Sequence, residues 1–334
     1  MTLRMPGEFA PHERTVMCWP TREEIYPGAL LDEARAAHAE LALAIARYEP
    51  VTMIACPDQA DAAARRCGDE IEVVPLPIDD SWFRDSGPIY VTGGGKRVAI
   101  DFAFNAWGEK FEPWTHDAAV ARAWAEHAGH TYHSVPLVFE GGSISTDGEG
   151  SFVTTTQCLM HPNRNPSLTQ REIEATLAQE LGAEAVLWLP YGLALDDDTD
   201  GHVDNVACFA APGVVVVQGC HDVTEDDHVR MDVNRRIADG WVDASGRPVE
   251  VVEVPVLPFA ERDGQRLVVP YLNYYVGNGF VVVPVCGHEA DADMLAIIAD
   301  QYPDRETFGL PVGEILAIGG GGIHCVTQQV PAVA

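Results

Sequence analysis

The chain of 334 residues has little positive charge: 21 Lys+Arg stand against 51 Asp+Glu, which gives a formal net charge of -30 at pH 7. Only Lys96 and Lys110 are lysines. This shortage argues against nucleic acid as a partner, because phosphates require a basic face, and against an anionic membrane surface. A summed negative field instead draws in cations, so the composition favours a cationic ligand, although the same charge can serve solubility alone.

Long apolar runs are also missing. The longest, such as residues 214–217 and 280–283, have the length of a strand and are far too short to span a bilayer. The N-terminal MTLRMPGEF contains no apolar run after Arg4, which argues against a secretory signal. Eight cysteines are scattered along the chain without a CxxC pair, as expected for reduced thiols in a cytosol. We therefore predict a cytoplasmic protein.

Several sequence motifs that indicate a particular chemistry are absent. The sequence has no HExxH, no clustered Cys/His spacing of a zinc site, no GxSxG and no P-loop. The glycines of GGGGIHCVTQQ (319–329) lack the spacing of a dinucleotide fingerprint, and the segment reads as a strand. We therefore expect neither a metal nor an organic cofactor.

The chain is predicted to be one α/β domain over residues 1–334, because no linker or low-complexity stretch divides it. Apolar residues at three- and four-residue spacing predict helices at 31–48, 117–130, 168–181, 222–238 and 290–302. Short apolar runs predict a strand after each helix, at 71–75, 132–138, 185–189, 251–257 and 314–318. A polar turn and a second strand follow, the latter at 89–91, 151–155, 214–217, 280–284 and 326–329.

These elements form five helix–strand–turn–strand units. Self-similarity at about 50 to 70 residues indicates a radially repeated architecture, in which all five polar turns would lie at one mouth. An ordinary α/β sheet with the turns at its strand ends is the alternative, and it would also bring the turns together.

Reactive side chains are concentrated in these polar turns. Cys325 follows four glycines, whose exposed amides can lower a thiol pKa, so it is a candidate nucleophile; a buried core thiol is the alternative. In GHVDN, strand alternation would place His202 and Asp204 on one face. A histidine that meets a cysteine from another segment is the usual arrangement for thiol catalysis, and a metal site is the rival interpretation.

The remaining turns supply carboxylates and aromatic groups. Asp85 stands beside a Gly-Pro turn, three residues after Trp82, whose indole face can bound a planar cation. Glu140 precedes two glycines. For both acids a turn-capping or solvated role is the alternative. The fifth turn, 271–279, offers aromatics and asparagines but no acid, and we expect it to close the site without taking part in catalysis.

One cysteine, one histidine and three carboxylates suit a planar cation better than an ester or a peptide. A guanidinium has five N–H donors in a fork, which carboxylates satisfy bidentately. Its central carbon accepts a thiolate if a group such as His202 protonates the departing nitrogen. The residues therefore predict a small cationic guanidino substrate.

Six blocks of this sequence, in this order, resemble the agmatine deiminase family, which belongs to the guanidine-modifying (pentein) superfamily of five-bladed α/β propellers with repeated ββαβ-type units. They are MPGEFAPHERTVMCWP (5–20), DSWFRDSGP (80–88), FNAWGEK (104–110), FEGGS (139–143), TDGHVDN (199–205) and GGGGIHCVTQQVP (319–331). The family also includes bacterial peptidyl-arginine deiminase-like proteins. The chain departs from it at Gly322, where Asn is common, and at residues 196–198, where a Glu is usual.

The resemblance implies a role for each candidate residue. Cys325 would be the nucleophile, His202 the general acid and base, and Asp85 and Asp204 the clamp on the guanidinium. Glu140 would be a further carboxylate in the pocket and Trp82 an aromatic wall. Asp198, in the acidic stretch before GHVDN, is a candidate ligand for the amine of agmatine.

The implied reaction is hydrolysis of agmatine to N-carbamoylputrescine and ammonia, without a cofactor. An arginine deiminase, a peptidyl-arginine deiminase and an amidinotransferase are the alternatives with related chemistry, and a non-catalytic cation-binding protein is the alternative of another class. A homodimer is the expected assembly, because two-fold dimers are the commonest soluble oligomers.

Overall fold

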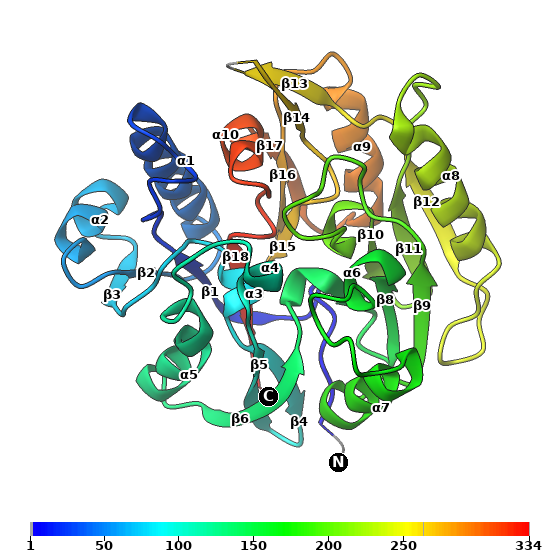
Figure 1. The fold of residues 1–334 in the computed structure, drawn as a ribbon, viewed down its shortest axis with the longest axis horizontal. Coiled ribbons are helices and arrows are strands. Elements are labelled where there is room, and N and C mark those ends of the chain that lie inside the picture. The colour runs from blue at the N-terminus through cyan, green and yellow to red at the C-terminus, as the bar shows by residue number, and fades with distance from the viewer. Residues whose placement is uncertain (1–2, 263, 334) are drawn as a thin grey trace.

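A computed structural model of the protein describes residues 3–262 and 264–333. The fold is α/β, as predicted, but the strands of the described residues are divided among six small sheets and do not form one continuous sheet. Helices α1, α5, α7, α8 and α9 lie toward the outside of the molecule, whereas α3 and β18 lie near its middle (Figure 1).

Four of the sheets repeat one order of elements: an antiparallel pair of strands, a helix, and a third strand parallel to the second. The first two are β4 (Ile89–Gly93), β5 (Lys96–Ala103), α5 (Asp117–His127) and β6 (Thr131–Val138), then β7 (Ile144–Thr146), β8 (Ser151–Thr155), α7 (Gln170–Leu181) and β9 (Ala185–Leu189). The next two are β10 (Ala207–Ala211), β11 (Val214–Gln218), α8 (Asp226–Asp239) and β12 (Glu250–Val254), then β15 (Tyr275–Gly277), β16 (Phe280–Pro284), α9 (Asp291–Gln301) and β17 (Glu306–Leu310).

The fifth copy of this order joins the two ends of the chain. The last strand, β18 (Thr327–Pro331), pairs antiparallel with the first, β1 (His12–Cys18), and β1 pairs in parallel with β2 (Val51–Ala55) across α1 (Ala29–Ala46). Two further elements extend this sheet, α2 (Ala60–Cys67) and β3 (Glu72–Pro75).

The elements outside the repeats are short. The hairpin β13 (Phe259–Arg262) and β14 (Gln265–Val268) forms a sheet of its own. The others are α3 (Phe83–Ser86), α4 (Ala106–Glu109), α6 (Thr156–Leu159), α10 (Gly313–Ile318) and the 3₁₀ helices η1 (Gly141–Ser143) and η2 (Val203–Asn205).

The five predicted helices are all confirmed, with ends that shift by a few residues. One predicted strand is wrong: residues 314–318 form helix α10, and the strand beside β16 is β17. A run of five mostly apolar residues fits a buried strand and a buried helical turn equally well, so periodicity could not separate them. The prediction also passed over β2 and α2, which lie between α1 and the strand at 72–75.

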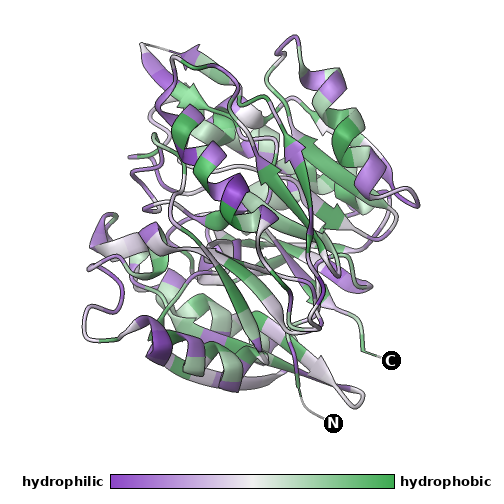
Figure 2. Cartoon of the chain, turned by 90° about the vertical axis from the view of Figure 1, so that its right-hand side faces the viewer, coloured by the Kyte–Doolittle hydropathy of each residue, from purple (hydrophilic) through white to green (hydrophobic). Residues whose placement is uncertain are grey.

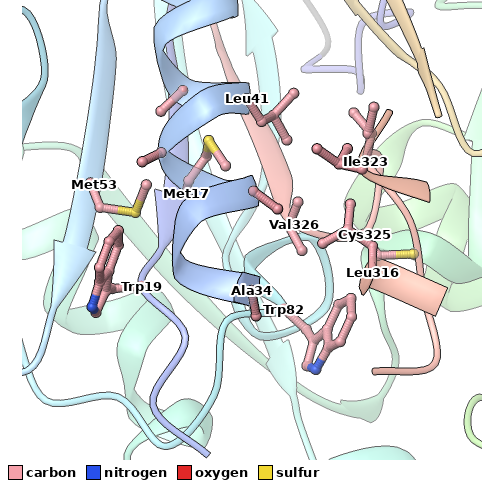
Figure 3. Close-up of a cluster of buried hydrophobic side chains, with 14 of the residues drawn as sticks. Met17, Trp19, Ala34, Leu41, Met53, Trp82, Leu316, Ile323, Cys325 and Val326 are labelled. Atoms are coloured by element: carbon pink, nitrogen blue, oxygen red, sulfur yellow. The ribbon is translucent and has the colours of Figure 1, made fainter. Parts of the chain in front are cut away.

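The largest hydrophobic cluster connects the chain ends to the residues singled out for chemistry. Figure 3 shows Leu41 of α1 in the same cluster as Leu316 of α10, together with Trp82 and Cys325. The strands are mostly hydrophobic in Figure 2, whereas the helices alternate between hydrophilic and hydrophobic residues, as expected for helices that cover a core on one face. The packing of this core therefore fixes where Cys325 and Trp82 lie.

A search of the described residues finds no helix that combines the length and the apolar character needed to cross a membrane.

Two leucines on α1 provide a test of this packing. Leu41 is fully buried and Leu43 is 37% exposed. We expect Leu41→Ala to lower the free energy of unfolding by about 2–5 kcal/mol, because it leaves a cavity in the cluster. Leu43→Ala should lower it by less than about 1 kcal/mol. Urea unfolding of both variants measures this, and equal losses would show that α1 does not pack as described.

Candidate active site

The side chains predicted to do chemistry are all buried, and they come from four separate polar turns. Each turn connects two strands or lies just before one, so the repeated order of elements brings the turns together. Cys325 lies between α10 and β18, Asp85 lies in α3, Glu140 directly precedes η1, and Asp204 lies in η2 with His202 just before it.

Gly142 marks the point at which three of these side chains meet. A Cβ atom placed on Gly142 would lie 2.6 Å from His202 Nδ1, 2.8 Å from Asp85 Oδ1 and 2.9 Å from Asp204 Oδ2. No side chain other than that of glycine leaves room for this arrangement, since real Cβ contacts are essentially never shorter than 3.0 Å.

The thiol of Cys325 lies among acids. Its Sγ is 3.3 Å from Asp204 Oδ2 and accepts a hydrogen bond of 3.1 Å from Asn273 Nδ2. Burial raises the pKa of Cys325 well above its usual value, and the negative charges of Asp204 and Asp85 raise it further. Before a ligand binds, this residue is therefore a protonated thiol at neutral pH.

The imidazole of His202 lies between two carboxylates. Its Nδ1 is 3.8 Å from Asp85 Oδ2 and its Nε2 is 3.9 Å from Glu140 Oε2. Burial lowers the pKa of His202, but Asp85, Cys158 and Glu140 outweigh it and raise the pKa well above the usual value. Neither ring nitrogen has a hydrogen-bond partner among the described residues, so both can meet a ligand or water.

Asp85 is held in place from two sides. Its Oδ1 accepts a hydrogen bond of 2.9 Å from the backbone N–H of Gly142, and its Oδ2 accepts one of 2.9 Å from Trp107 Nε1. Burial raises the pKa of Asp85, the charge of His202 lowers it and the charge of Asp204 raises it, with a net rise. These bonds lead away from its own turn, so the alternative that Asp85 only caps that turn is wrong.

Asp204 is oriented by a histidine that the sequence interpretation missed. Its Oδ2 is 2.9 Å from His324 Nδ1, while Nε2 of His324 is 2.8 Å from Glu8 Oε1. Arg84 Nη1 donates to the same Glu8 oxygen over 3.1 Å. Burial raises the pKa of Glu8, but His324 and Arg84 lower it to about 2. The His324 side chain thus bridges two carboxylates, and Asp204 Oδ1 stays without a partner among the described residues.

Glu140 lies beside His202 and is not on the wall of the pocket described below. Its Oε1 accepts a hydrogen bond of 2.6 Å from Arg164 Nε, and both side chains are fully buried. Burial raises the pKa of Glu140, whereas Arg164 and His202 lower it below its usual value. The geometry gives Glu140 contact with His202, and its direct contact with a ligand stays a prediction.

The pocket beside Cys325 has two indole walls, Trp82 and Trp107. Trp82 packs against the glycine run, where a Cβ on Gly321 would lie 2.6 Å from its ring. Asp198 is half-buried and also faces this pocket, and the described lining residues include no Arg or Lys. The lining is Ile25, Trp82, Asp85, Trp107, Phe111, Asp198, Thr199, Gly319, Gly320 and Cys325.

Trp107, the second indole, is carried by an unusual turn. The residues from Ala106 to Glu109 have φ values of 51°, 55°, 98° and 61°, so α4 is a left-handed turn in which only Gly108 adopts this conformation without strain. Left-handed backbone costs roughly 1–2 kcal/mol per non-glycine residue. This strained turn places Trp107 where its Nε1 donates a hydrogen bond to Asp85.

Three buried groups could in principle ligate a metal. Atoms of Glu140, Cys158 and His202 lie within 4.8 Å of one another. Arg164 Nε already donates to Glu140 Oε1 over 2.6 Å, however, so a positive charge is fixed beside one of the three groups and repels a second cation. The donor set therefore does not suit a resident metal.

The sequence placed His202 and Asp204 together for the wrong reason. They do not alternate along a strand; Asp204 lies in η2, and the turn brings both side chains to Gly142. Sequence reasoning also missed Trp107, His324 and Asn273, although FNAWGEK had been singled out and His324 is adjacent to Cys325. Their contacts join segments between 22 and 120 residues apart, which no local pattern reveals.

Comparison with known proteins agrees with this geometry. Residues 4–331 match the family model described as Porphyromonas-type peptidyl-arginine deiminase. Agmatine deiminase of Pseudomonas aeruginosa is 40% identical, over 98% of this chain and 95% of the relative.

Two solved structures have the same fold over nearly the whole chain. The structure of agmatine deiminase of Enterococcus faecalis catalysing its reaction is 32% identical, with a TM-score of 0.94 over 98% of this chain and 96% of the other. A Cys-to-Ser variant of C. jejuni agmatine deiminase with substrate bound is 25% identical, with a TM-score of 0.91 over 99% and 97% of the two chains. This chain therefore belongs to the Porphyromonas-type peptidyl-arginine deiminase family and is a relative of the agmatine deiminases within it.

Proposed function

We propose that the protein hydrolyses agmatine to N-carbamoylputrescine and ammonia. One observation carries the proposal: a buried thiol, a histidine and two aspartates converge beside a pocket with indole walls, in a chain similar to agmatine deiminases over its full length. A flat cation fits such a pocket, because indole faces attract cations and carboxylates bind guanidinium groups in pairs.

In the first half of the reaction Cys325 attacks the central carbon of the guanidinium. Asp204 Oδ1 has no partner among the described residues, and together with Asp85 it would accept N–H groups of the substrate. The bound cation would offset the two negative charges that raise the thiol pKa, so that Cys325 loses its proton to water as the substrate binds and regains one after the product leaves. The sulfur forms a C–S bond, His202 gives a proton to one terminal nitrogen, and ammonia leaves a covalent thiouronium.

In the second half a water molecule replaces the ammonia. His202, now neutral, removes a proton from this water, and the oxygen forms a C–O bond to the thiouronium carbon. The C–S bond then breaks, its electron pair returns to Cys325 as the thiolate, and the proton left on the new hydroxyl passes to the released ammonia by way of water as the ureido product leaves. Overall, guanidinium and water become urea and ammonium. Glu140 contacts His202, so we propose that it keeps the imidazole oriented and protonated before the first step.

Asp198 supports agmatine over arginine as the substrate. Its carboxylate faces the pocket, and no Arg or Lys stands among the described lining residues to receive a carboxylate. Agmatine ends in an amine where arginine carries its amine together with a carboxylate. We therefore propose that Asp198 binds the amine at the end of the agmatine tail.

We also propose that the chain is one domain in which the five repeated units are arranged radially around this site, as a five-bladed propeller of the pentein type. The recurring element order and the convergence of turns from successive units support this arrangement. The site then consists of one turn from each of several units.

The function is tested with a substrate panel of agmatine, arginine, arginine peptides and guanidino acids, each scored for ammonia and for ureido product. We expect agmatine to have the highest kcat/KM and to yield both products in equal amounts. An amine product without ammonia would indicate an amidinotransferase. A higher kcat/KM for arginine or its peptides would show that one of these, and not agmatine, is the substrate.

Cys325→Ser supplies the matching loss of function. This variant should bind agmatine, as followed by calorimetry, but release no ammonia, because a hydroxyl at this position is too weak a nucleophile. Turnover close to that of the unsubstituted protein would rule out Cys325 as the nucleophile.

Asp85→Asn should lower kcat/KM by roughly 10³-fold. It removes the negative charge that faces the bound cation while keeping the size of the side chain. Steady-state kinetics with agmatine measure this. A loss below about tenfold would mean that Asp85 serves only to hold Trp107 and Gly142.

Two neighbouring acids form a matched pair for tail binding. Asp198 faces the pocket and Asp197 is exposed. Asp198→Asn should raise the KM for agmatine by roughly tenfold with little change in kcat, because the tail lies away from the reacting carbon. Asp197→Asn should leave KM unchanged. An equal effect of the two substitutions would mean that the acidic stretch acts only through its overall charge.

A further inference from the structure

The side chain of Asn273 is fully buried and lies directly against the proposed nucleophile. Its Nδ2 donates hydrogen bonds to Cys325 Sγ over 3.1 Å and to Asn205 Oδ1 over 2.9 Å. Asn273 belongs to the segment 271–279, which the sequence predicted to close the site without taking part in catalysis. These contacts assign it a larger part.

The hydrogen bonds around Asn273 determine which end of its amide faces the sulfur. Its Oδ1 accepts from the backbone N–H of His324 over 2.9 Å and from that of Cys325 over 3.4 Å. In the flipped orientation, two N–H groups would face the amide nitrogen and the carbonyl oxygen would face Asn205 Oδ1. That arrangement loses all of these bonds, so the donor faces Cys325.

The glycine run supplies the space that Asn273 occupies. A Cβ atom on Gly322 would lie 2.5 Å from Asn273 Oδ1, closer than real Cβ contacts permit. Gly322 therefore has to lack a side chain so that the Asn273 amide can lie against it. Gly321 leaves room for Trp82 and Cys325 in the same way.

The negative charges of the site make the Cys325 thiolate costly to form, so a hydrogen-bond donor at the sulfur would stabilise it. The carboxylates of Asp204 and Asp85 oppose ionisation of Cys325. The thiol can donate its own proton to Asp204 Oδ2 at 3.3 Å or to Asn273 Oδ1 at 3.5 Å. Once that proton leaves, the N–H of Asn273 still points at the sulfur, where a hydrogen bond to a charged atom is stronger than one to a neutral atom.

We propose that Asn273 is a catalytic residue whose side-chain N–H stabilises the thiolate of Cys325. It lowers the cost of forming the thiolate before the C–S bond forms, and it stabilises the same thiolate again when that bond breaks and the ureido product leaves. This role rests on the proposed function, in which Cys325 is the nucleophile.

The test measures the thiolate directly in the absence of substrate. Iodoacetamide is neutral and reacts with thiolates, so at a pH below the thiol pKa its rate of reaction follows the thiolate fraction. Alkylation of Cys325 is followed by peptide mass spectrometry between about pH 7 and pH 9 in the unsubstituted protein, Asn273→Ala and Asn273→Asp. Mass spectrometry is needed because the chain has eight cysteines.

Loss of the donor should slow alkylation of Cys325 roughly 10- to 100-fold and lower kcat for agmatine by a similar factor. Asn273→Asp should slow alkylation at least as much, because it keeps the acceptor for the two backbone N–H groups but adds a negative charge beside the sulfur. This variant preserves the backbone contacts, so it keeps the test decisive if Asn273→Ala does not fold.

Asn278→Ala is the matched control. Asn278 comes from the same segment, and its side chain bonds the backbone of His12 at 2.9 Å, away from Cys325. In this variant the rate of Cys325 alkylation and the kcat for agmatine should be unchanged. Unchanged alkylation in both Asn273 variants would overturn the proposal and leave the proposed function intact. Turnover by Cys325→Ser would instead rule out Cys325 as the nucleophile, and failure of the unsubstituted protein to hydrolyse agmatine would overturn the function itself.

Discussion

The site depends on one constraint, the burial of several carboxylates away from bulk solvent. A buried charge is costly unless it is paired, and breaking such a pair costs several kcal/mol. Glu140 is paired with Arg164, and Glu8 with Arg84 and His324. Because the partners come from different turns, these pairs connect the turns to one another.

The buried polar atoms that remain without a hydrogen-bond partner indicate where a ligand binds. Buried polar groups in folded proteins nearly always have a partner, so exceptions point to a function. In the described part of the chain, Asp204 Oδ1, Glu140 Oε2 and both ring nitrogens of His202 have none. The N–H groups of a flat cation satisfy such carboxylate oxygens, and water accepts from the N–H groups of a protonated imidazole. The buried ion pairs therefore leave carboxylate oxygens of the site free near the pocket.

Much of this site could be predicted from the sequence, for identifiable reasons. Cys325, His202 and Asp85 stand in turns between apolar strands, and a repeated order of elements brings such turns together. The same reasoning mistook 314–318 for a strand, because five residues are too few for a period to appear. It also missed Asn273 and His324, whose importance arises only from contacts across the fold. The homodimer and the cytoplasmic location stay predictions.

The pairing of β18 with β1 has a consequence for how the protein is made. Among the strands of the described residues, β1 is synthesised first and β18 last, so β1 must wait for all the strands between them before its antiparallel partner exists. Pairing between such distant segments is slow to form, and chains fold in part while they emerge from the ribosome. Cys325 lies two residues before β18. A nascent chain that stops before Cys325 therefore has neither this strand nor its thiol, and the site is assembled only after both have been synthesised.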